Sequence, residues 1–441
     1  MDRLPEFSAH DTSLIRIPDQ LDVPVSPRVR KILDSAAMQR LRGVSQLGLV
    51  GKVYPGATHS RFEHSLGVYR LACQVLQRLL AVESDFSADL TIEDAECFLL
   101  VALLHDVGHW PYCHPIEDLQ LDWVPRHEEL ARSLICGGEL SKLIELDWRV
   151  APESVADFLA GKQPSSAPGS VLQNVMNGPV DIDKMDYLQR DSLHAGVPYG
   201  RNFDVGRLTA SFCIGQDQKG LAISEKGKTA AEMMVFARYV MFSEVYWHHT
   251  VRSATAMLQR LVFELREHMS AETWLQQSDA EFGANCLDQS QARPEFQHLA
   301  ESLFGNRRAL YKRVGQFSYM ENPELHTALS RLPYPELLGI SERFAARLRR
   351  DGVECGPAEV LIDAPPVKLE VQFRLSVRIK GGGNRPEFVP LSTISPVVNS
   401  LATEQFDSFV KRVRVFMAPS VAAGLKMNQS EIVERLLESV G

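Results

Sequence analysis

The sequence predicts a mainly α-helical protein, in which an all-helical core with a small β-hairpin is followed by a smaller α+β lobe. Helices are expected because apolar side chains recur at helical spacing along residues 63–80, 91–107 and 229–268. Residues 211–224 alternate around a polar, glycine-flanked centre, which is typical of a hairpin. Residues 367–379 alternate apolar with mostly polar side chains, which predicts a strand with one buried face.

The first two predicted helices carry histidine and aspartate side chains. His64 lies four residues before Val68, at the start of the apolar face of the first helix, and therefore points toward the interior. The second helix begins with Thr91 and has Asp94 three residues later, an arrangement close to a capping box. It then runs apolar into His105 and Asp106.

A change of character near residue 320 predicts two domains. We expect a core over residues 1–320, which contains the motifs of residues 61–191 and a further long active-site helix at 229–268, with at most one break. The smaller α+β lobe is expected over residues 321–441, where strand-like alternation becomes frequent.

The composition is that of an ordinary globular protein, with 441 residues, of which 45% are hydrophobic and 23% charged. A net charge of −9 argues against binding of nucleic acid through overall charge. No apolar run approaches the roughly 18 residues of a membrane span, and the N-terminus lacks the apolar stretch of a signal peptide. Seven scattered cysteines without a CxxC pair argue against disulfides and a thiolate zinc site. We therefore expect a cytoplasmic protein without membrane contact.

The segment LLHDVGHWPYCH, residues 103–114, directly follows an apolar helix. The dipole of a helix C-terminus mildly favours a cationic histidine, but this explains only one of them. The presence of His105, Asp106, His109 and His114 together indicates a metal and acid–base site, since histidine and carboxylate ligands from several elements bind divalent cations. The inward-facing His64 and the aspartates among residues 177–191 offer further ligands.

The segments RFEHSLGV, LLHDVGHWPYCH and DIDKMDYLQRD, in the order H…HD…D, resemble the HD-domain phosphohydrolase superfamily. Within it, the chain is similar to the deoxynucleoside triphosphate triphosphohydrolase branch, which includes the SAM- and HD-domain dNTPases. The resemblance extends from about Asp34 to Ala418, without the SAM domain that precedes the core in some members.

The resemblance implies a role for each matching position. The implied metal ligands are His64, His105, Asp106 and Asp183. The implied catalytic residues are His109, His114, Glu117 and His127. The implied phosphate contacts are Arg61, Lys184, Tyr187 and Arg238, and the implied sugar contacts are Gln46, Leu47, Asp191 and Tyr246. From the residues alone, tyrosines such as Tyr187 and Tyr246 are more often core aromatics than substrate contacts, and His127 beside two glutamates is compatible with an exposed ion pair.

The resemblance also implies partners. Asp34, Gln39 and Arg42 match residues that read a guanine effector at a subunit interface in regulated members. The same run occurs in relatives without known effectors, and His249 stands where some relatives use a lysine for a regulatory nucleotide. Members assemble as dimers or tetramers, so a homo-oligomer is expected.

Residues and resemblance together predict metal-dependent hydrolysis of deoxynucleoside triphosphates (dNTPs) to deoxynucleoside and inorganic triphosphate. One alternative is an HD phosphohydrolase that acts on another nucleotide or on a single-stranded nucleic-acid end. A non-catalytic nucleotide sensor is a third interpretation, against which the intact His105, Asp106, His114 and His127 argue. Mg, Mn, Fe and Zn all tolerate histidine and carboxylate ligands, so the identity of the metal stays open.

Overall fold

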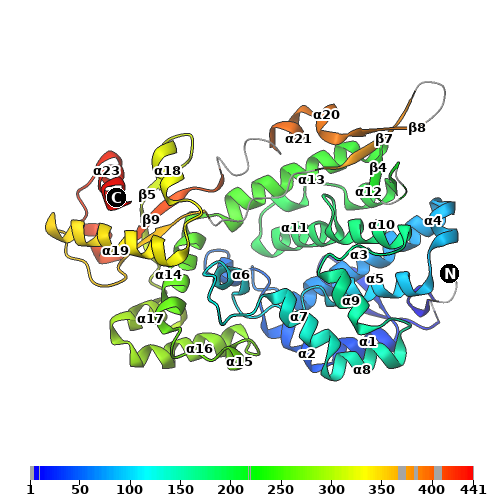
Figure 1. The fold of residues 1–441 in the computed structure, drawn as a ribbon, viewed down its shortest axis with the longest axis horizontal. Coiled ribbons are helices and arrows are strands. Elements are labelled where there is room, and N and C mark those ends of the chain that lie inside the picture. Colours follow the sequence, from blue (N-terminus) through cyan, green and yellow to red (C-terminus); the bar gives the residue numbers. More distant parts are fainter. Residues whose placement is uncertain are drawn as a thin grey trace.

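The computed structural model describes residues 4–8, 10–216, 218, 220–365, 374–381, 386–401 and 410–440. It is mainly helical with small sheets, as predicted (Figure 1). Up to Leu265 the helices are α1 (Pro27–Asp34), α2 (Ala36–Arg40), α3 (Arg61–Val82), α4 (Ser84–Asp89), α5 (Ile92–Leu104), α6 (Cys113–Glu117), α7 (His127–Cys136), α8 (Gly138–Asp147), α9 (Pro152–Leu159), α10 (Ala167–Asn177), α11 (Ile182–Ala195), α12 (Val205–Ala210), α13 (Lys228–Met241) and α14 (His249–Leu265). The later helices are α15 (Ala271–Trp274), α16 (Asp279–Gln289), α17 (Gln297–Phe304), α18 (Pro323–Leu329), α19 (Tyr334–Arg350), α20 (Leu391–Ile394), α21 (Pro396–Ser400), α22 (Pro419–Gly424) and α23 (Gln429–Val440).

Short 3-10 turns and a π-helix connect these helices. The 3-10 turns are η1 (Pro5–Phe7), η2 (Leu41–Gly43), η3 (Gly48–Lys52), η4 (Tyr199–Arg201), η5 (Glu225–Gly227), η7 (Ser290–Ala292) and η8 (Pro294–Phe296). The π-helix η6 (Phe242–Tyr246) lies between α13 and α14. It is the one break that the pattern of residues 229–268 allows, and π-helical turns of this kind are frequent at functional sites.

Within the described residues the strands form three small sheets. They are β1 (Ser13–Ile17), β2 (Leu21–Val25), β3 (Phe212–Ile214), β4 (Leu221–Ser224), β5 (Lys312–Phe317), β6 (Val360–Asp363), β7 (Ser376–Lys380), β8 (Pro386–Pro390) and β9 (Val413–Met417). The predicted hairpin is confirmed, because β3 and β4 pair antiparallel with Phe212 opposite Ile223. Strand β7 joins that hairpin in parallel to β4, and β8 completes the order β3-β4-β7-β8. The second sheet has the order β5-β9-β6, and β1 pairs only with β2.

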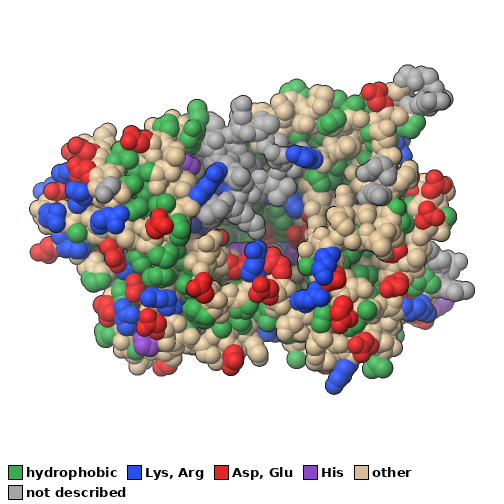
Figure 2. Space-filling model, in the orientation of Figure 1, with side chains coloured by type: hydrophobic (Ala, Val, Ile, Leu, Met, Phe, Trp, Pro, Cys, Tyr) green, Lys and Arg blue, Asp and Glu red, His purple; other side chains and the backbone are tan. Residues whose placement is uncertain are grey.

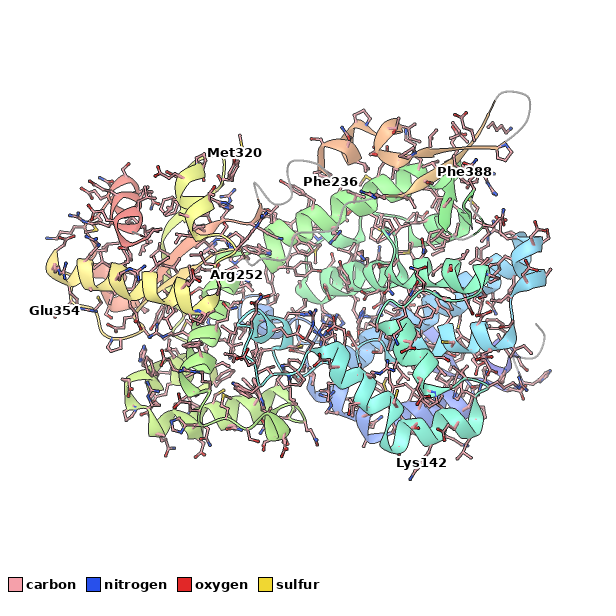
Figure 3. All side chains as sticks on the ribbon, viewed as in Figure 1. Lys142, Phe236, Arg252, Met320, Glu354 and Phe388 are labelled. Carbon is pink, nitrogen blue, oxygen red and sulfur yellow. The ribbon has the colours of Figure 1, made fainter. Side chains whose placement is uncertain are left out.

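Two hydrophobic clusters hold the elements together. The first extends from Leu4 to Val251 and includes Leu375, Val377, Leu391 and Val398 from the β7–α21 segment. The second contains α14 and most of the later elements, together with Leu49 and the buried residues between Trp110 and Leu119. Helix α14 leads from one cluster into the other (Figure 1). Arg252, near its start, pairs with Asp363 of β6 at that junction (Figure 3). The division of the chain at residue 320 remains a prediction.

Element boundaries differ from the predictions in three places. Helix α5 ends at Leu104, and residues 105–108 form a turn, where the sequence predicted helix to residue 107. The long helix ends at Leu265. Of the predicted strand at 367–379, residues 367–373 lie outside the described residues, and the strand is observed over Ser376–Lys380. Among the helices of the described segments, none combines the length and apolar character that crossing a membrane requires.

Candidate metal centre and active site

Four side chains converge where α3, α5 and α11 meet. His64 comes from the first turn of α3, His105 and Asp106 from the turn after α5, and Asp183 from the first turn of α11. The Nε2 atom of His64 lies 2.9 Å from Oδ1 of Asp183 and 3.2 Å from Nε2 of His105. The His105 Nε2 lies 3.7 Å from Oδ1 of both Asp106 and Asp183. We call these four residues the metal quartet.

The spacing of the quartet fits a divalent ion. Metal–ligand bonds of about 2.1 Å place neighbouring ligand atoms about 3 to 3.5 Å apart, which matches the separations of 2.9 and 3.2 Å around His64. Burial disfavours a charged His64 ring, yet the carboxylates of Asp183 and Asp186 outweigh burial and raise its pKa to about 10. The surroundings of His64 therefore favour positive charge, and a metal ion would take the place of the proton on its Nε2 atom.

Hydrogen bonds behind the ligands fix their orientation. Nδ1 of His64 lies 2.8 Å from Oδ2 of Asp186, and Nδ1 of His105 lies 3.0 Å from the Ala102 carbonyl oxygen. Arg190 donates to both oxygens of Asp186, at 2.7 and 2.8 Å. Both imidazoles are thus held by their Nδ1 atoms, which leaves Nε2 for the metal.

Two glycines allow this close approach of helices. A Cβ atom on Gly67 of α3 would collide with Asp186 and with the Arg190 guanidinium. A Cβ atom on Gly108 would collide with the backbone of His127 and Ala131 in α7. Neither glycine has a positive φ, so the requirement is one of space and not of backbone conformation.

Arg61 and His109 surround Asp106. The Arg61 guanidinium donates from Nη1 to Oδ2 of Asp106 at 2.8 Å, and its buried Nε has no partner in the described part of the chain. Nδ1 of His109 lies 3.1 Å from Oδ1 of Asp106. Burial first, and the Arg61 charge second, hold the pKa of His109 well below its usual value, so the ring is neutral at pH 7.

A second histidine group lies beside the quartet. The ring centroid of His109 lies 5.1 Å from that of His114 and 4.2 Å from that of His127. Glu117 links the other two rings, since Oε1 lies 2.8 Å from Nδ1 of His127 and Oε2 lies 3.6 Å from Nδ1 of His114. His114 is the accessible member, with 58% of its side chain exposed against 17% for His127. Histidine side chains are visible in the hollow at the centre of the face in Figure 2.

The turn before α6 positions this second group. Tyr112 adopts φ 54°, a left-handed conformation that costs a residue with a side chain some strain. Its ring packs against Phe282 and Phe304, with centroids 5.5 and 5.8 Å away. This packing holds the turn that brings His114 and Glu117 toward His109.

Cys113 adjoins the second histidine group, and together its potential donor atom and those of the three histidines lie within 4.8 Å of one another. Burial raises the pKa of the Cys113 thiol far above its usual value, however, and thiol ligands bind metals as thiolates. The thiol therefore fits a packing role, and the metal quartet is the better cation site.

A third group lies farther along α11. Tyr246 of η6 donates its hydroxyl proton to Oδ2 of Asp191 at 2.6 Å, while Nε2 of His59 lies 2.9 Å from Oδ1. The Tyr187 ring lies 6.4 Å from the Tyr246 ring. The backbone N–H of Gln46 donates to the His59 carbonyl oxygen at 2.9 Å, and the buried side-chain Oε1 of Gln46 has no partner among the described residues.

The remaining predicted residues have other contacts. The Lys184 ammonium pairs with Asp181 and donates to the Gly178 carbonyl oxygen at 3.3 Å. The Arg238 guanidinium lies 5.5 Å from the Phe242 ring centroid, and Leu47 packs against the first hydrophobic cluster.

The positions matched to an effector lie on α1, α2 and η2. Asp34 is exposed, Gln39 donates to the Leu33 carbonyl oxygen at 2.7 Å, and the Arg42 guanidinium lies 4.2 Å from the Phe62 ring centroid. None of these contacts tests the implied effector.

Two residues at the site were not predicted as functional. Asp186 was noted only as one of several aspartates, although its place behind His64 makes it the anchor of a ligand. Its spacing from Asp183, three residues along a helix, was the signal that pointed to it. His59 had no signal, because its contact with Asp191 joins residues 132 positions apart.

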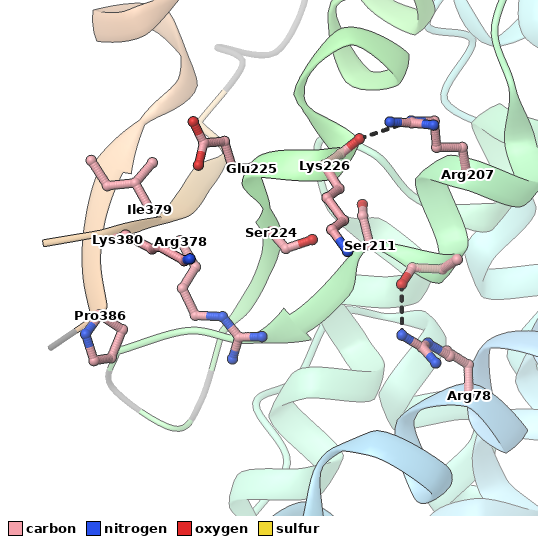
Figure 4. A pocket seen from close by; sticks show the side chains of 11 residues that line it. Arg78, Arg207, Ser211, Ser224, Glu225, Lys226, Arg378, Ile379, Lys380 and Pro386 are labelled. Carbon is pink, nitrogen blue, oxygen red and sulfur yellow. Dashed lines mark hydrogen bonds between the residues drawn. The ribbon is translucent and has the colours of Figure 1, made fainter. Parts of the chain in front are cut away.

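A separate cavity of about 640 Å³ lies between β4, β7 and the ends of α3 and α12 (Figure 4). Five cations line it, and two of them are fixed by backbone carbonyls. Arg78 donates to the Ala210 oxygen and Arg207 to the Lys226 oxygen, both at 3.0 Å. The other cations are Lys226, Arg378 and Lys380, and Glu225 is the one carboxylate among its described lining residues.

Comparisons with known proteins agree with this geometry. The model of the HD domain matches residues 61–162, and the model of the HD associated region matches residues 203–433. An uncharacterized protein of Methanocaldococcus jannaschii is 30% identical over 86% of this chain and 74% of its own length. The deoxynucleoside triphosphate triphosphohydrolase SAMHD1 of Gallus gallus is 29% identical over 51% of this chain and 41% of its own length.

Solved structures share the fold over nearly the whole chain. A hypothetical protein from Aquifex aeolicus superposes with a TM-score of 0.69 at 24% identity, over 96% of this chain and all of that one. A phosphohydrolase from Bacteroides thetaiotaomicron superposes with a TM-score of 0.68 at 19% identity, over 92% of this chain and 99% of that one. Taken with the metal quartet, the two matching models and the archaeal relative show that the chain belongs to the family of HD-domain proteins that carry an HD-associated region.

Proposed function

We propose that the chain is a divalent-metal-dependent phosphohydrolase that converts dNTPs to deoxynucleoside and inorganic triphosphate. The observation that carries this proposal is a row of side chains on α11. Asp183, Tyr187 and Asp191 recur every fourth residue, so they share one face and span about 12 Å of the helix. Asp183 belongs to the metal quartet, and Asp191 to the Tyr246 group. A nucleotide can lie along this row with its phosphates near the helix N-terminus, which favours anions.

The metal would be held by His64, His105, Asp106 and Asp183. A bound divalent ion supplies a polarised phosphoryl oxygen and a water of lowered pKa, and Mg, Mn, Fe and Zn all suit such ligands. Arg61 is fixed on Asp106 and offers further donors to the phosphates. His109 stays neutral beside it and can donate a hydrogen bond without adding charge. Lys184, Tyr187 and Arg238 are the further phosphate contacts that we propose.

The leaving sugar oxygen needs a proton. Water attacks the α-phosphorus, the bond from phosphorus to the 5′-oxygen breaks, and the three phosphates leave together. We assign the donor as His114, because it is the accessible ring of the second histidine group. Oε2 of Glu117 lies 3.6 Å from Nδ1 of His114, and its Oε1 holds His127, whose Nδ1 it contacts at 2.8 Å. His127 is thereby positioned to contact the phosphate that is attacked.

The sugar would lie at the Asp191 end of the row. Tyr246 is tied to Asp191, so its ring cannot move aside easily for a 2′-hydroxyl. The buried Oε1 of Gln46 offers an acceptor for a 3′-hydroxyl, and the neighbouring Leu47 gives an apolar contact. A site that pairs one hydroxyl and excludes another discriminates by a few kcal/mol, or about two orders of magnitude.

The names of two relatives also support the proposed substrate. The proteins from Gallus gallus and Homo sapiens, 29% and 27% identical, carry the name deoxynucleoside triphosphate triphosphohydrolase. The chain spans less than half of the length of either. A cytoplasmic location, a homo-oligomer and a nucleotide effector near Asp34, Gln39 and Arg42 remain predictions.

Product identification tests the proposal. Each dNTP and NTP is incubated with the protein and with Mg, Mn, Fe or Zn, and the products are separated by ion-exchange chromatography. We expect deoxynucleoside and inorganic triphosphate from dNTPs, with much slower turnover of NTPs. Turnover of nucleoside monophosphates, cyclic nucleotides or single-stranded ends, with dNTPs inert, would favour the alternative phosphohydrolase. Binding of nucleotides without turnover under any metal would favour a sensor.

A further inference from the structure

A cavity of about 120 Å³ lies on the side of α11 that carries Asp186 and Arg190. Its walls come from α3, α11, α12 and the turn between β1 and β2. Asp186 forms part of the wall and at the same time contacts Nδ1 of His64 at 2.8 Å. Asp186 therefore links the cavity to the metal quartet, because it contacts the proposed ligand His64.

Of the two arginines that line this cavity, Arg190 is held by close ion pairs with Asp186 and Glu63. Asp186 is paired with Arg190 and His64, and Asp19 is paired with Arg201 at 2.9 Å. Arg70 of α3 also lines the cavity and is half-buried. It forms no hydrogen bond or ion pair with any residue of the described segments. Asp186 and Asp22 attract its charge. A half-buried guanidinium that donates no hydrogen bond nevertheless loses hydration without replacing it.

Apart from Gln189, the rest of the cavity wall is apolar. Leu21, Leu71, Met185, Leu193 and Val205 form most of the remaining wall. Its volume is close to that of cavities of about 150 Å³ that accept a benzene ring. A ligand that matches both features has a small apolar body and a single anionic group.

We infer that this cavity binds a small organic monocarboxylate, with the carboxylate on Arg70 and the apolar body between α3 and α11. Guanidinium and carboxylate form paired hydrogen bonds of matching geometry, which suits a single fixed arginine. Because Asp186 forms part of the wall, occupancy is linked to the orientation of His64 and hence to metal retention. This inference goes beyond the proposed function and does not depend on which substrate is cleaved.

The test uses 4-fluorobenzoate as the probe, and ¹⁹F NMR measures its binding to the metal-loaded protein. We expect saturable binding in the millimolar range, weakened at least about tenfold in Arg70→Gln, as expected for the loss of one charged hydrogen-bonding partner. Val205→Phe fills the cavity without touching Arg70 and should abolish binding. Arg78→Gln changes another arginine of α3, which faces the separate cavity of Figure 4, and should bind as the wild type does.

Three results would overturn the inference. They are no binding by the folded wild type, equal binding by Arg70→Gln and Val205→Phe, and equal binding of the uncharged 4-fluorobenzamide. The linkage to the metal has its own readout, which is the rate of metal release to a chelator. We expect 4-fluorobenzoate to change that rate in the wild type and not in Val205→Phe. An unchanged rate in the wild type at saturation would refute the linkage, whether or not the protein hydrolyses dNTPs.

Discussion

Asp186 accepts a hydrogen bond from Nδ1 of His64 at 2.8 Å. It also accepts two hydrogen bonds from the Arg190 guanidinium, one on each carboxylate oxygen. This relationship places a carboxylate behind a proposed metal ligand, where it fixes the ring and raises its basicity. The ligand and its anchor come from different helices, which approach closely because Gly67 carries no side chain.

Asp186→Asn should therefore weaken metal binding about 10- to 100-fold while the four ligands stay in place. The amide keeps the size of the side chain but loses the charge that holds His64. Metal affinity is measured by competition with a chelator. Asp157→Asn, which removes a surface carboxylate paired with Arg132 and Lys162, is the matched control. Equal metal affinities of the two variants would contradict the role of Asp186 in holding His64.

The metal quartet predicts a larger effect when two ligands are removed. The double variant His105→Ala and Asp106→Ala should lose metal uptake and all activity yet remain folded, as judged by circular dichroism. His268→Ala, which removes an exposed histidine at the end of α14, should keep full occupancy. Full metal content of the double variant by elemental analysis would refute the assignment.

Glu117 predicts a dependence of stability on pH. Its two histidine contacts outweigh burial and hold the pKa of its carboxyl well below the usual value. A lowered folded-state pKa stabilises the protein at pH values above the unfolded-state pKa of about 4.3, and the contribution is lost as the pH falls below it. The melting temperatures of wild type and Glu117→Gln should therefore differ at pH 6, and the difference should shrink progressively as the pH falls below about 4 toward the lowered pKa. A difference that persists unchanged at low pH would contradict the role of this charge.

Variants of Tyr246 and His114 should affect different properties, namely the preference for the sugar and the rate of hydrolysis. Tyr246→Ala removes the ring that is tied to Asp191, and should raise the relative turnover of NTPs more than it slows dNTP turnover. His114→Ala removes the proposed proton donor, and should slow dNTPs about 10²- to 10⁴-fold without changing the preference for the sugar. Ratios of kcat/KM for dGTP and GTP report both effects. A loss of rate in Tyr246→Ala with a changed sugar preference in His114→Ala would contradict both assignments.

Local patterns predicted the helices well but not their interruptions. The inward position of His64 follows from its spacing to Val68, and the side chain of His64 is buried as expected. The spacing of apolar residues does not show that residues 242–246 form the π-helix η6. The turn that ends α5 at Leu104 places His105 and Asp106 for the quartet, whereas the apolar pattern alone favoured a longer helix.

Long-range pairing was the part that the sequence did not reveal. The alternation at residues 376–379 predicted a strand, but not that β7 would lie parallel to β4, more than 150 residues earlier. In the same way, His59 and Asp191 meet only through tertiary structure. The metal quartet could be named because its residues lie in extended motifs, while Asp186 and His59 needed the arrangement of helices to show their role.

The central claim is tested most directly by hydrolysis of a dNTP in water labelled with ¹⁸O, followed by mass spectrometry of the products. Attack at the α-phosphorus predicts one ¹⁸O atom in the inorganic triphosphate and none in the deoxynucleoside. The variant with His105→Ala and Asp106→Ala should give neither product. Label in the deoxynucleoside, or release of pyrophosphate with deoxynucleoside monophosphate, would contradict the account.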